Sequence, residues 1–452
     1  MKNVSQMKKK YTFGICAIVF IMFLSVAYYV LRVIQENNHL GSLAESMNYL
    51  MTGNFKNKND TEDEFVEHSQ IYNYLVDAAK DQKKSVIKPV TTLVGYNGLP
   101  TDSEKLCYKL IKSNCNNIAT TSHKSGLYAI DQITVKDNKL SPLQIKKVLY
   151  AIQNDNPDIF WIANSFSYQY VGNNTILKLN SILSRNDQQE AIKRLSKKVS
   201  SILSKISADS SAYQKELYVH DYILNNCKYS YQKDNQKIYT SYGCLIENKA
   251  VCEGYSKAAQ LLLNTLGIEC STITGSKKKE NEPHMWNIVK IKNRWYHLDV
   301  TWDGSGKTGR YNYFNVDDKT IKSDHTINED VNTIKKLSDS KRYNFKLPQC
   351  NSMAENYYNK NAIKIEKLDS NSANSIIKKL ADLASKKKKY IYIKITSNYN
   401  DIKKQLIGEK PYKLFKYIAD ANKKSNNKLS TNKINYSDNK TQKVLIIELF
   451  YK

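Results

Sequence analysis

Cys252 is the residue whose surroundings in the sequence best suit nucleophilic chemistry. It follows Val251 and begins a run in which apolar residues recur at helical spacing, up to Gly267, a residue type that closes many helices. Cys252 is therefore expected in the first turn of a helix. Unpaired backbone N–H groups and the positive end of the helix dipole favour the thiolate there, and the thiolate is the nucleophilic form of cysteine.

Two strands are expected downstream of this helix. The segments 284–291 and 294–301 have the alternation and the β-forming residues that are typical of strands. Lys292 and Asn293 lie between them, and Asn tolerates the positive φ that a tight hairpin loop requires. The two strands are therefore predicted to pair as an antiparallel hairpin.

The register of this hairpin decides which side chains meet. A two-residue loop pairs Ile291 with Arg294, so Trp286 lies opposite residue 299. Asp299 then becomes the diagonal neighbour of His284, with about 7 Å between the backbones, a gap that the two side chains can bridge. A four-residue loop keeps this parity, whereas a three-residue loop destroys it. The residues expected on one face are His284, Trp286, Trp295, His297 and Asp299.

A cysteine thiolate, a histidine acid/base and an aspartate that orients the histidine form a set used for acyl transfer through a thioester. Three motifs surround these residues: G-x-L-x-x-x-x-A-V-C-x-G-Y at 243–255, H-x-W-N at 284–287 and W-Y-H-L-D-V-T-W-D at 295–303. In combination they resemble the transglutaminase-like superfamily of papain-related cysteine enzymes, over residues 211–320. The segment that begins at His220 also resembles the helix that precedes the nucleophile in that family.

The resemblance implies that Cys252 is the nucleophile, His284 the acid/base and Asp299 the group that orients it. These are the residues that the helix and the hairpin select. Two other histidines remain open as alternative bases. His297 shares the predicted face, and His220 precedes the nucleophile, where a structural contact is the simpler interpretation.

The backbone N–H of Cys252 is one expected donor to the oxyanion that forms in acyl transfer. The sequence does not fix the second donor. Tyr242 lies close upstream and Trp286 lies near the expected base, so both are candidates for the oxyanion site or the cleft, although packing is the commoner role of such aromatics. We expect no cofactor and no metal, because the hairpin does not favour zinc geometry for its Cys and His.

An apolar stretch near the N-terminus is expected to anchor the chain in a membrane. The run from Tyr11 to Leu31 carries no charged residue and is long enough to cross a bilayer. Lysines at 8–10 precede it and place the N-terminus in the cytoplasm, with the rest of the chain outside. A signal peptide cleaved near Ala27 is the alternative, and it implies export as well.

Composition and periodicity divide the chain further. The predicted fold class is α+β, with a papain-like core that has the nucleophile at a helix N-terminus and the His and Asp on adjacent antiparallel strands. The expected segments are a cytoplasmic tail at 1–10, a transmembrane anchor at 11–34, a linker at 35–60, an accessory α/β domain at 61–210, the catalytic core at 211–345 and a small basic α/β domain at 346–452.

The charge balance points to anionic surroundings. The chain has 69 Lys and Arg against 43 Asp and Glu, which suits a cell-wall polymer, another polyanion or a membrane surface. No nucleic-acid motif accompanies this charge, so no nucleic-acid partner is expected. The abundance of Asn, Lys, Ile and Tyr is typical of an AT-rich bacterial genome. Six cysteines are open to either disulfide pairing or free thiols: Cys107, Cys115, Cys227, Cys244, Cys270 and Cys350.

These features predict a single-pass membrane protein with an extracellular cysteine protease or acyltransferase domain of the transglutaminase-like class. Its expected substrates are peptides or proteins of the cell envelope. The sequence leaves open whether water or an amine resolves the thioester. The alternative function is a catalytically silent wall-binding or scaffold protein that retains the fold.

Overall fold

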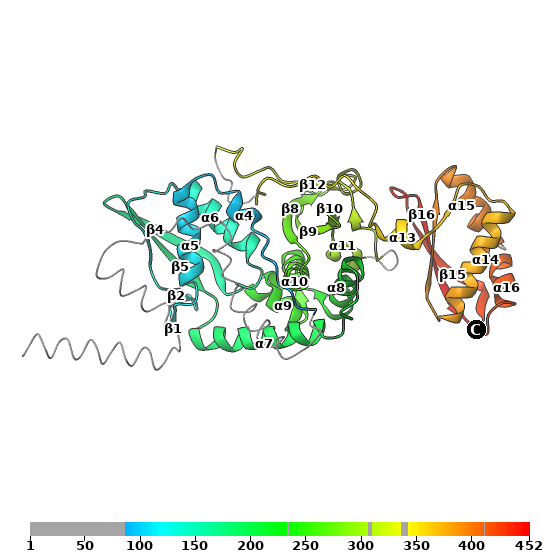
Figure 1. Cartoon of the computed structure of the whole chain (residues 1–452), viewed down its shortest axis with the longest axis horizontal. Helices are drawn as coiled ribbons and strands as arrows, with labels where there is room; N and C mark the ends of the chain where they lie inside the picture. The colour runs from blue at the N-terminus through cyan, green and yellow to red at the C-terminus, as the bar shows by residue number, and fades with distance from the viewer. Residues whose placement is uncertain (1–85, 233–234, 306–309, 336–341, 411) are drawn as a thin grey trace, which may run out of the picture. The chain divides into compact units, whose positions relative to one another are not determined.

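A computed structural model describes the chain from residue 86 to residue 452, except for 233–234, 306–309, 336–341 and 411 (Figure 1). The predicted cytoplasmic tail, transmembrane anchor, linker and first helix of the accessory domain lie outside the described residues. Within the part that the structure describes, every helix is too short or too polar to cross a bilayer.

The accessory segment folds into a five-stranded antiparallel sheet accompanied by three helices (Figure 1). Strand β5 pairs with β2 and β3 and also with β4. The residues Gly172, Asn173 and Asn174 predict a hairpin loop in the sequence, and the structure confirms it, because Val171 pairs with Asn174 across a two-residue loop. The elements are α4 (Val94–Asn97), α5 (Asp102–Asn114), β1 (Ile118–Ser122), β2 (Tyr128–Ile130), β3 (Ile133–Val135), α6 (Pro142–Asp155), β4 (Ile162–Val171) and β5 (Asn174–Ser181).

Local signals predicted most of these elements but not the first one. Helix α6 begins at a capping box on Ser141 with Pro142 in its first turn, as the sequence predicts. The sequence also predicts a short strand near 90–94, which is wrong: residues 90–93 form no strand, and helix α4 begins at Val94. The carboxylate of Asp155 accepts the backbone N–H groups of Gly95 and Tyr96 at 2.7 and 2.8 Å. This long-range contact fixes the turn, and the local sequence pattern does not indicate it.

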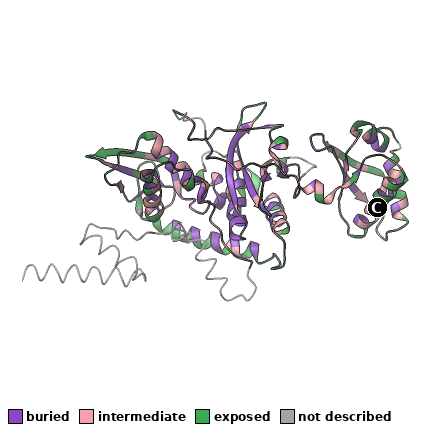
Figure 2. Cartoon of the chain, turned by 45° about the horizontal axis from the view of Figure 1, so that its top comes forward, coloured by how far each residue is buried: buried purple, intermediate pink, exposed green. Residues whose placement is uncertain are grey.

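The catalytic segment packs helix α10 against a sheet of order β11-β10-β9-β8-β12 (Figure 1). Both the helix and the central strands of this sheet are buried (Figure 2). Helix α7 (Arg185–Leu203) ends the accessory segment, and the helices of the catalytic segment are α8 (Ala212–Asn226), α9 (Ser241–Leu245), α10 (Cys252–Thr265), α11 (Val300–Ser305) and α12 (Asp318–Ile321). The sheet strands are β8 (Cys270–Lys277), β9 (Pro283–Ile291), β10 (Arg294–Leu298), β11 (Phe314–Val316) and β12 (His325–Ile327); β6 (Lys228–Tyr229) and β7 (Lys249–Ala250) form a separate parallel pair.

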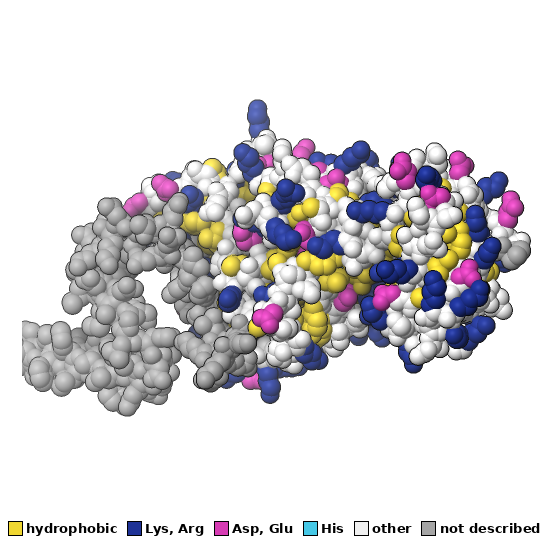
Figure 3. Space-filling model, turned by 45° about the vertical axis from the view of Figure 1, so that its right-hand side comes forward, with side chains coloured by type: hydrophobic (Ala, Val, Ile, Leu, Met, Phe, Trp, Pro, Cys, Tyr) yellow, Lys and Arg dark blue, Asp and Glu magenta, His cyan; other side chains and the backbone are white. Residues whose placement is uncertain are grey.

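The C-terminal segment has a four-stranded sheet of order β13-β14-β16-β15 and its own hydrophobic cluster. The sequence predicts strands at 362–365, 390–395 and 444–450 and helices at 371–384 and 412–423; these are present, but β15 and α15 were missed. Lys and Arg side chains are dispersed over the face of the molecule seen in Figure 3 rather than forming one stripe. The elements are α13 (Tyr357–Asn361), β13 (Ile363–Ile365), α14 (Ser370–Ser385), β14 (Tyr390–Ile395), α15 (Tyr399–Ile407), α16 (Lys413–Asn422), β15 (Leu429–Asn439) and β16 (Val444–Tyr451).

The accessory and catalytic segments share one hydrophobic core, which extends from Val86 to Phe345. Such continuous burial holds the two segments together and makes the accessory sheet a wall of the catalytic region. The seven cysteines of the described part are free thiols, so none of the open disulfide pairings forms there.

Candidate active site

Cys252 is the first residue of helix α10, as the sequence predicts. The chain reaches it in an extended conformation at Val251, so the thiol lies beside the unpaired N–H groups of the first turn. Gly254 allows this close entry: a Cβ there would lie 2.5 Å from the carbonyl oxygen of Ile238. At the other end Gly267 has a φ of +79°, the left-handed conformation expected after the helix. Cys252 is half-buried, whereas the other described thiols are buried.

The predicted register of the β9–β10 hairpin is confirmed. Ile291 pairs with Arg294, and the loop residues Lys292 and Asn293 have φ values of 50° and 60°. The second strand, however, ends at Leu298 rather than continuing to residue 301. Asp299 follows and turns the chain into helix α11. Its side chain caps the first turn of that helix. This cap fixes the aspartate more firmly than a strand position would.

His284 and Asp299 meet as the register predicts. The Nε2 of His284 donates to Oδ2 of Asp299 at 2.7 Å, while Oδ1 of Asp299 accepts the backbone N–H of Trp302 at 3.0 Å. Burial opposes ionisation of Asp299, but the charge and hydrogen bond of His284 hold the pKa of Asp299 well below its usual range. The carboxylate is therefore charged and oriented.

The side chain of Cys252 lies close enough to the imidazole of His284 to raise its pKa. Because Nε2 faces Asp299, Nδ1 is the nitrogen left for the sulfur. Burial lowers the pKa of His284, but Asp299 and then Cys252 together raise it to about 10. A charged imidazolium between the sulfur of Cys252 and the carboxylate of Asp299 is the state that this arrangement favours.

His325 is a residue of this site that sequence reasoning missed. Its Nε2 donates to the same Oδ2 of Asp299 at 3.1 Å, and its Nδ1 lies 2.7 Å from Oδ1 of Asp324. The ring lies 4.1 Å from that of Trp302. His325 stands on β12, a three-residue strand that carries no periodic signal and follows all three motifs. A long-range strand pairing with β8 brings it to the site.

The two alternative bases have other partners. His297 accepts the indole N–H of Trp286 on Nδ1 at 3.0 Å, and its Nε2 donates to Asp318 at 2.8 Å. Burial lowers the pKa of His297 despite Asp318. His220 is buried between two carboxylates, with Nε2 3.1 Å from Asp303. Both imidazoles have their nitrogens engaged within the fold, so the structure places neither beside the thiol.

The side chains of the two oxyanion candidates are engaged in packing. The only N–H of the Trp286 side chain is donated to its neighbouring strand, and the ring is buried. Tyr242 stacks on Phe160 at 5.0 Å between ring centres and is buried too. Instead, the phenol of Tyr229 lies beside the backbone N–H of Cys252. Tyr229 follows helix α8 in a short parallel strand pair, which local patterns did not predict.

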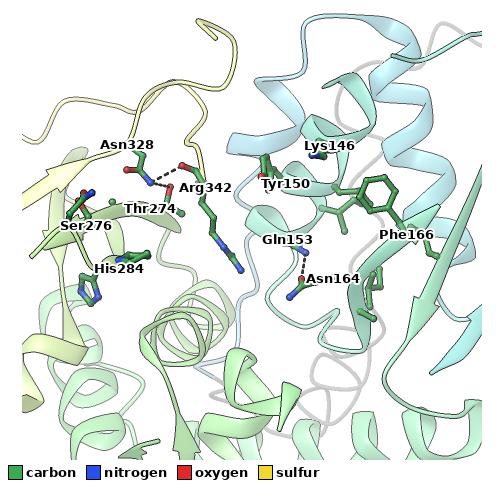
Figure 4. A pocket seen from close by; sticks show the side chains of 18 residues that line it. Lys146, Tyr150, Gln153, Asn164, Phe166, Thr274, Ser276, His284, Asn328 and Arg342 are labelled. Carbon is green, nitrogen blue, oxygen red and sulfur yellow. Dashed lines mark hydrogen bonds between the residues drawn. The ribbon is translucent and has the colours of Figure 1, made fainter. Parts of the chain in front are cut away.

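Two cavities meet at His284. One has a volume of 710 Å³ and lies between helix α6 and strand β4 on one side and strand β8 on the other (Figure 4). The second has a volume of 680 Å³ and is lined by aromatic residues that include Tyr229, Tyr231 and Trp302. Pro283 and His284 line both. An extended chain can therefore pass the imidazole with room on each side.

Two clusters in the described residues bring possible metal ligands within 4.8 Å of one another. In the first, His284 and His325 both direct Nε2 to Asp299. In the second, a metal on Nε2 of His297 would meet an imidazole whose Nδ1 already accepts the Trp286 N–H. Such a ring would need to lose both protons to bind the metal. Hydrogen bonding therefore accounts for both clusters.

Part of this chain matches a known protein family, and its structure matches several solved structures. The family model described as the core of the transglutaminase-like superfamily matches residues 200–300. No match is found among curated proteins. Solved structures that match include a TGase, 17% identical, which covers 38% of this chain and 50% of its own with a TM-score of 0.20.

Two further matches are structures described as candidate proteases. One is a cysteine protease from Cytophaga hutchinsonii, 12% identical over 41% of this chain and 70% of that chain, with a TM-score of 0.21. The other comes from Parabacteroides distasonis, 11% identical over 30% and 35%, with a TM-score of 0.18. This chain thus spans about half the length of the TGase. The segment from residue 200 to residue 300 carries the core of the transglutaminase-like superfamily, as its motifs predict.

Proposed function

We propose that this protein is a cysteine acyl-transfer enzyme that acts on peptides or proteins through a thioester on Cys252. The observation that carries the proposal is the His284–Asp299 hydrogen bond beside Cys252, with His284 lining two cavities. A catalytically silent scaffold would place no demand on that arrangement. A buried aspartate and an imidazole with a raised pKa, beside a half-buried thiol, are typical of functional sites.

The first half-reaction forms the thioester. The thiolate of Cys252 attacks the carbonyl carbon of an amide, and the carbonyl oxygen takes the negative charge. His284 donates its Nδ1 proton to the amine as the C–N bond breaks, and Asp299 keeps the ring in place throughout. The neutral imidazole that remains can accept a proton from the next nucleophile.

The oxyanion of this step needs at least one donor. The backbone N–H of Cys252 is at the start of a helix and points toward the developing charge. The hydroxyl of Tyr229 lies beside that N–H, and burial raises the pKa of Tyr229, so the hydroxyl keeps its proton. We assign Tyr229 as the second donor in place of the two aromatic residues considered from the sequence.

The second half-reaction releases the acyl group to water or to an amine. His284 takes a proton from the incoming nucleophile as it attacks the thioester, and the thiolate of Cys252 leaves. Water gives a peptidase or amidase, and an amine gives a cross-linking acyltransferase. The cavity beyond His284 that holds Tyr229 and Tyr231 provides space for either.

The same proposal places the enzyme outside the cell membrane, acting on envelope peptides. Its support is the uncharged run from Tyr11 to Leu31 with lysines before it. Residues 362–452 contain 21 lysines and only 8 acidic residues, and this positive charge suits contact with an anionic wall polymer. Protease treatment of intact cells tests this placement: the catalytic segment should be digested, while a cytoplasmic control protein survives.

Thioester trapping tests the chemistry. The full chain is incubated with a peptide library, quenched in acid and analysed by mass spectrometry, with and without an added amine. We expect an acyl adduct on Cys252 of the wild-type protein, no adduct on Cys252→Ala, and products that identify the acceptor. A folded wild-type protein that forms no adduct with any peptide, and whose Cys252 reacts with iodoacetamide no faster than its other thiols, would support the silent scaffold instead.

A further inference from the structure

The 710 Å³ cavity beside His284 has a one-sided charge. Among the described residues that line it, Lys146 and Arg342 are cations, and no carboxylate joins them. Arg342 extends from the catalytic side into the cavity, while Lys146 lies on helix α6 across from it (Figure 4). A cleft lined by one sign of charge and walled by protein concentrates ions of the opposite sign.

The nearest carboxylate does not cancel this charge. Glu253 accepts Lys257 on Oε1 and Arg342 on Oε2, both at 2.8 Å. Burial would raise the pKa of Glu253, but Arg342 and Lys257 lower it to about 2, so it carries one negative charge against two positive charges. One positive charge of these three residues is left over. Arg342 is the partner that also reaches the cavity.

Arg342 retains binding capacity for an anion. Its Nη2 is engaged by Glu253, and its side chain is 37% exposed. A guanidinium has five N–H donors in a planar fork that matches a carboxylate. The remaining donors can therefore hold a second carboxylate in the cavity while the first stays in place.

We propose that this cavity binds a carboxylate group of the substrate, with Arg342 as its main partner and Lys146 on the opposite wall. The inference rests on the proposed function, because it assigns a substrate class to the same site: peptides with an acidic group close to the amide that Cys252 attacks. His284 lines the same cavity, so the bound carboxylate lies on the part of the peptide next to the reacting carbonyl.

The second cavity differs in kind. Tyr229, Tyr231 and Trp302 line it, and its cations Lys228 and Lys277 are accompanied by Glu282. Aromatic faces with mixed charges favour an apolar or neutral peptide segment over an anionic one. The two cavities therefore give the substrate a direction, with its acidic side toward Arg342.

Two small alkylating reagents test the inference on the full-length protein. Iodoacetate carries a carboxylate and iodoacetamide is its neutral analogue, and each forms a thioether on Cys252 with loss of iodide. Their rates are followed by mass spectrometry at pH 6. We expect the iodoacetate-to-iodoacetamide rate ratio at Cys252 to exceed that of the same thiol in urea. Arg342→Gln should lower the ratio roughly fivefold at low salt, whereas Arg342→Lys should largely retain it.

Matched variants separate an effect of the cavity on this rate ratio from other effects of a lost charge. Lys388→Gln removes an exposed lysine of the C-terminal segment and should leave the ratio unchanged. Lys146→Gln should lower it about twofold, and this variant replaces Arg342→Gln if loss of the Glu253 pair prevents folding. An unchanged ratio in these cleft variants overturns the inference while rapid iodoacetamide labelling leaves the proposed function intact. Slow labelling of Cys252 by both reagents contradicts the proposed function itself.

Discussion

His284 and His297 share one face of the same hairpin, yet the fold gives their imidazoles opposite properties. Each has a carboxylate on Nε2, at 2.7 Å for Asp299 and 2.8 Å for Asp318. The pKa of His284 is raised to about 10, whereas that of His297 is lowered. The carboxylate beside His284 is fully buried, and the one beside His297 is one-third exposed.

The partner of the second ring nitrogen, Nδ1, also differs between the two histidines. Nδ1 of His284 is left for a thiol that can become an anion, while Nδ1 of His297 accepts the N–H of Trp286 and must stay unprotonated. A histidine beside an aspartate is therefore no sign of catalysis by itself. The partner of the far nitrogen decides whether the ring can carry and move a proton.

Exchanging the two histidines for alanine gives the largest expected contrast. His284→Ala should lower the rate of acyl transfer about 10⁴-fold, because the thiol loses the group that holds and moves its proton. His297→Ala should lower it less than about tenfold and instead reduce stability by about 1–3 kcal/mol, because Trp286 is left with an unpaired N–H. Turnover of a trapped peptide and urea unfolding measure the two effects. Equal losses of activity in folded variants would contradict the different roles assigned to His284 and His297.

Replacing the two carboxylates sharpens the same contrast. Asp299→Asn should reduce acyl transfer about 10³-fold, since an amide cannot stabilise the imidazolium or accept both His284 and His325. Asp318→Asn should change it by no more than about threefold, because a partly exposed partner contributes little. The rate constant for thioester formation is the measurement. A large effect at Asp318 would show that the His297 network serves catalysis.

His325 gives a smaller effect of a different kind. His325→Gln should lower kcat about tenfold with little change in KM, because Asp299 loses one of the two donors that fix its carboxylate. His325→Asn serves as a control with a shorter amide. The alkaline limb of the pH–rate profile should move to lower pH in both. A parallel loss of folded protein without any shift of that limb would assign His325 a merely structural role.

The pH dependence of stability is the smallest and most specific contrast. A His284 pKa of about 10 in the fold against about 6.5 in the unfolded chain gives stabilisation that is complete below pH 6.5 and is lost as pH rises through 10. The unfolding free energy of wild type minus that of His284→Gln should therefore shrink by about 4 kcal/mol between pH 6.5 and 10. For His297→Gln the difference should shrink toward acid instead. Urea titrations at each pH measure both.

The parts of the site that the sequence predicted are those set by local rules. Helical spacing located Cys252, and the two-residue loop at Lys292 and Asn293 fixed the hairpin register by parity. Those two elements were enough to place His284 near Asp299. The end of strand β10 was misplaced because the cap made by Asp299 is itself part of the tertiary site.

The parts that escaped prediction depend on contacts between distant segments. His325 reaches the site through pairing of β12 with β8, and Arg342 reaches its cavity from an irregular segment. Helix α4 follows from the carboxylate of Asp155, some sixty positions away. Strand β15 is rich in Asn and Ser and lies at a sheet edge, so its burial pattern carries no clear alternation.

The charge state of His284 tests the account most directly. In ¹⁵N-labelled protein, the ring nitrogens of His284 and His297 can be assigned by NMR with the two alanine variants and followed from pH 5 to pH 9. The account predicts that His284 remains doubly protonated across this range and that His297 gains its second proton only at a lower pH than an ordinary imidazole. A neutral His284 at pH 7, with the Cys252 thiol still protonated, would contradict it.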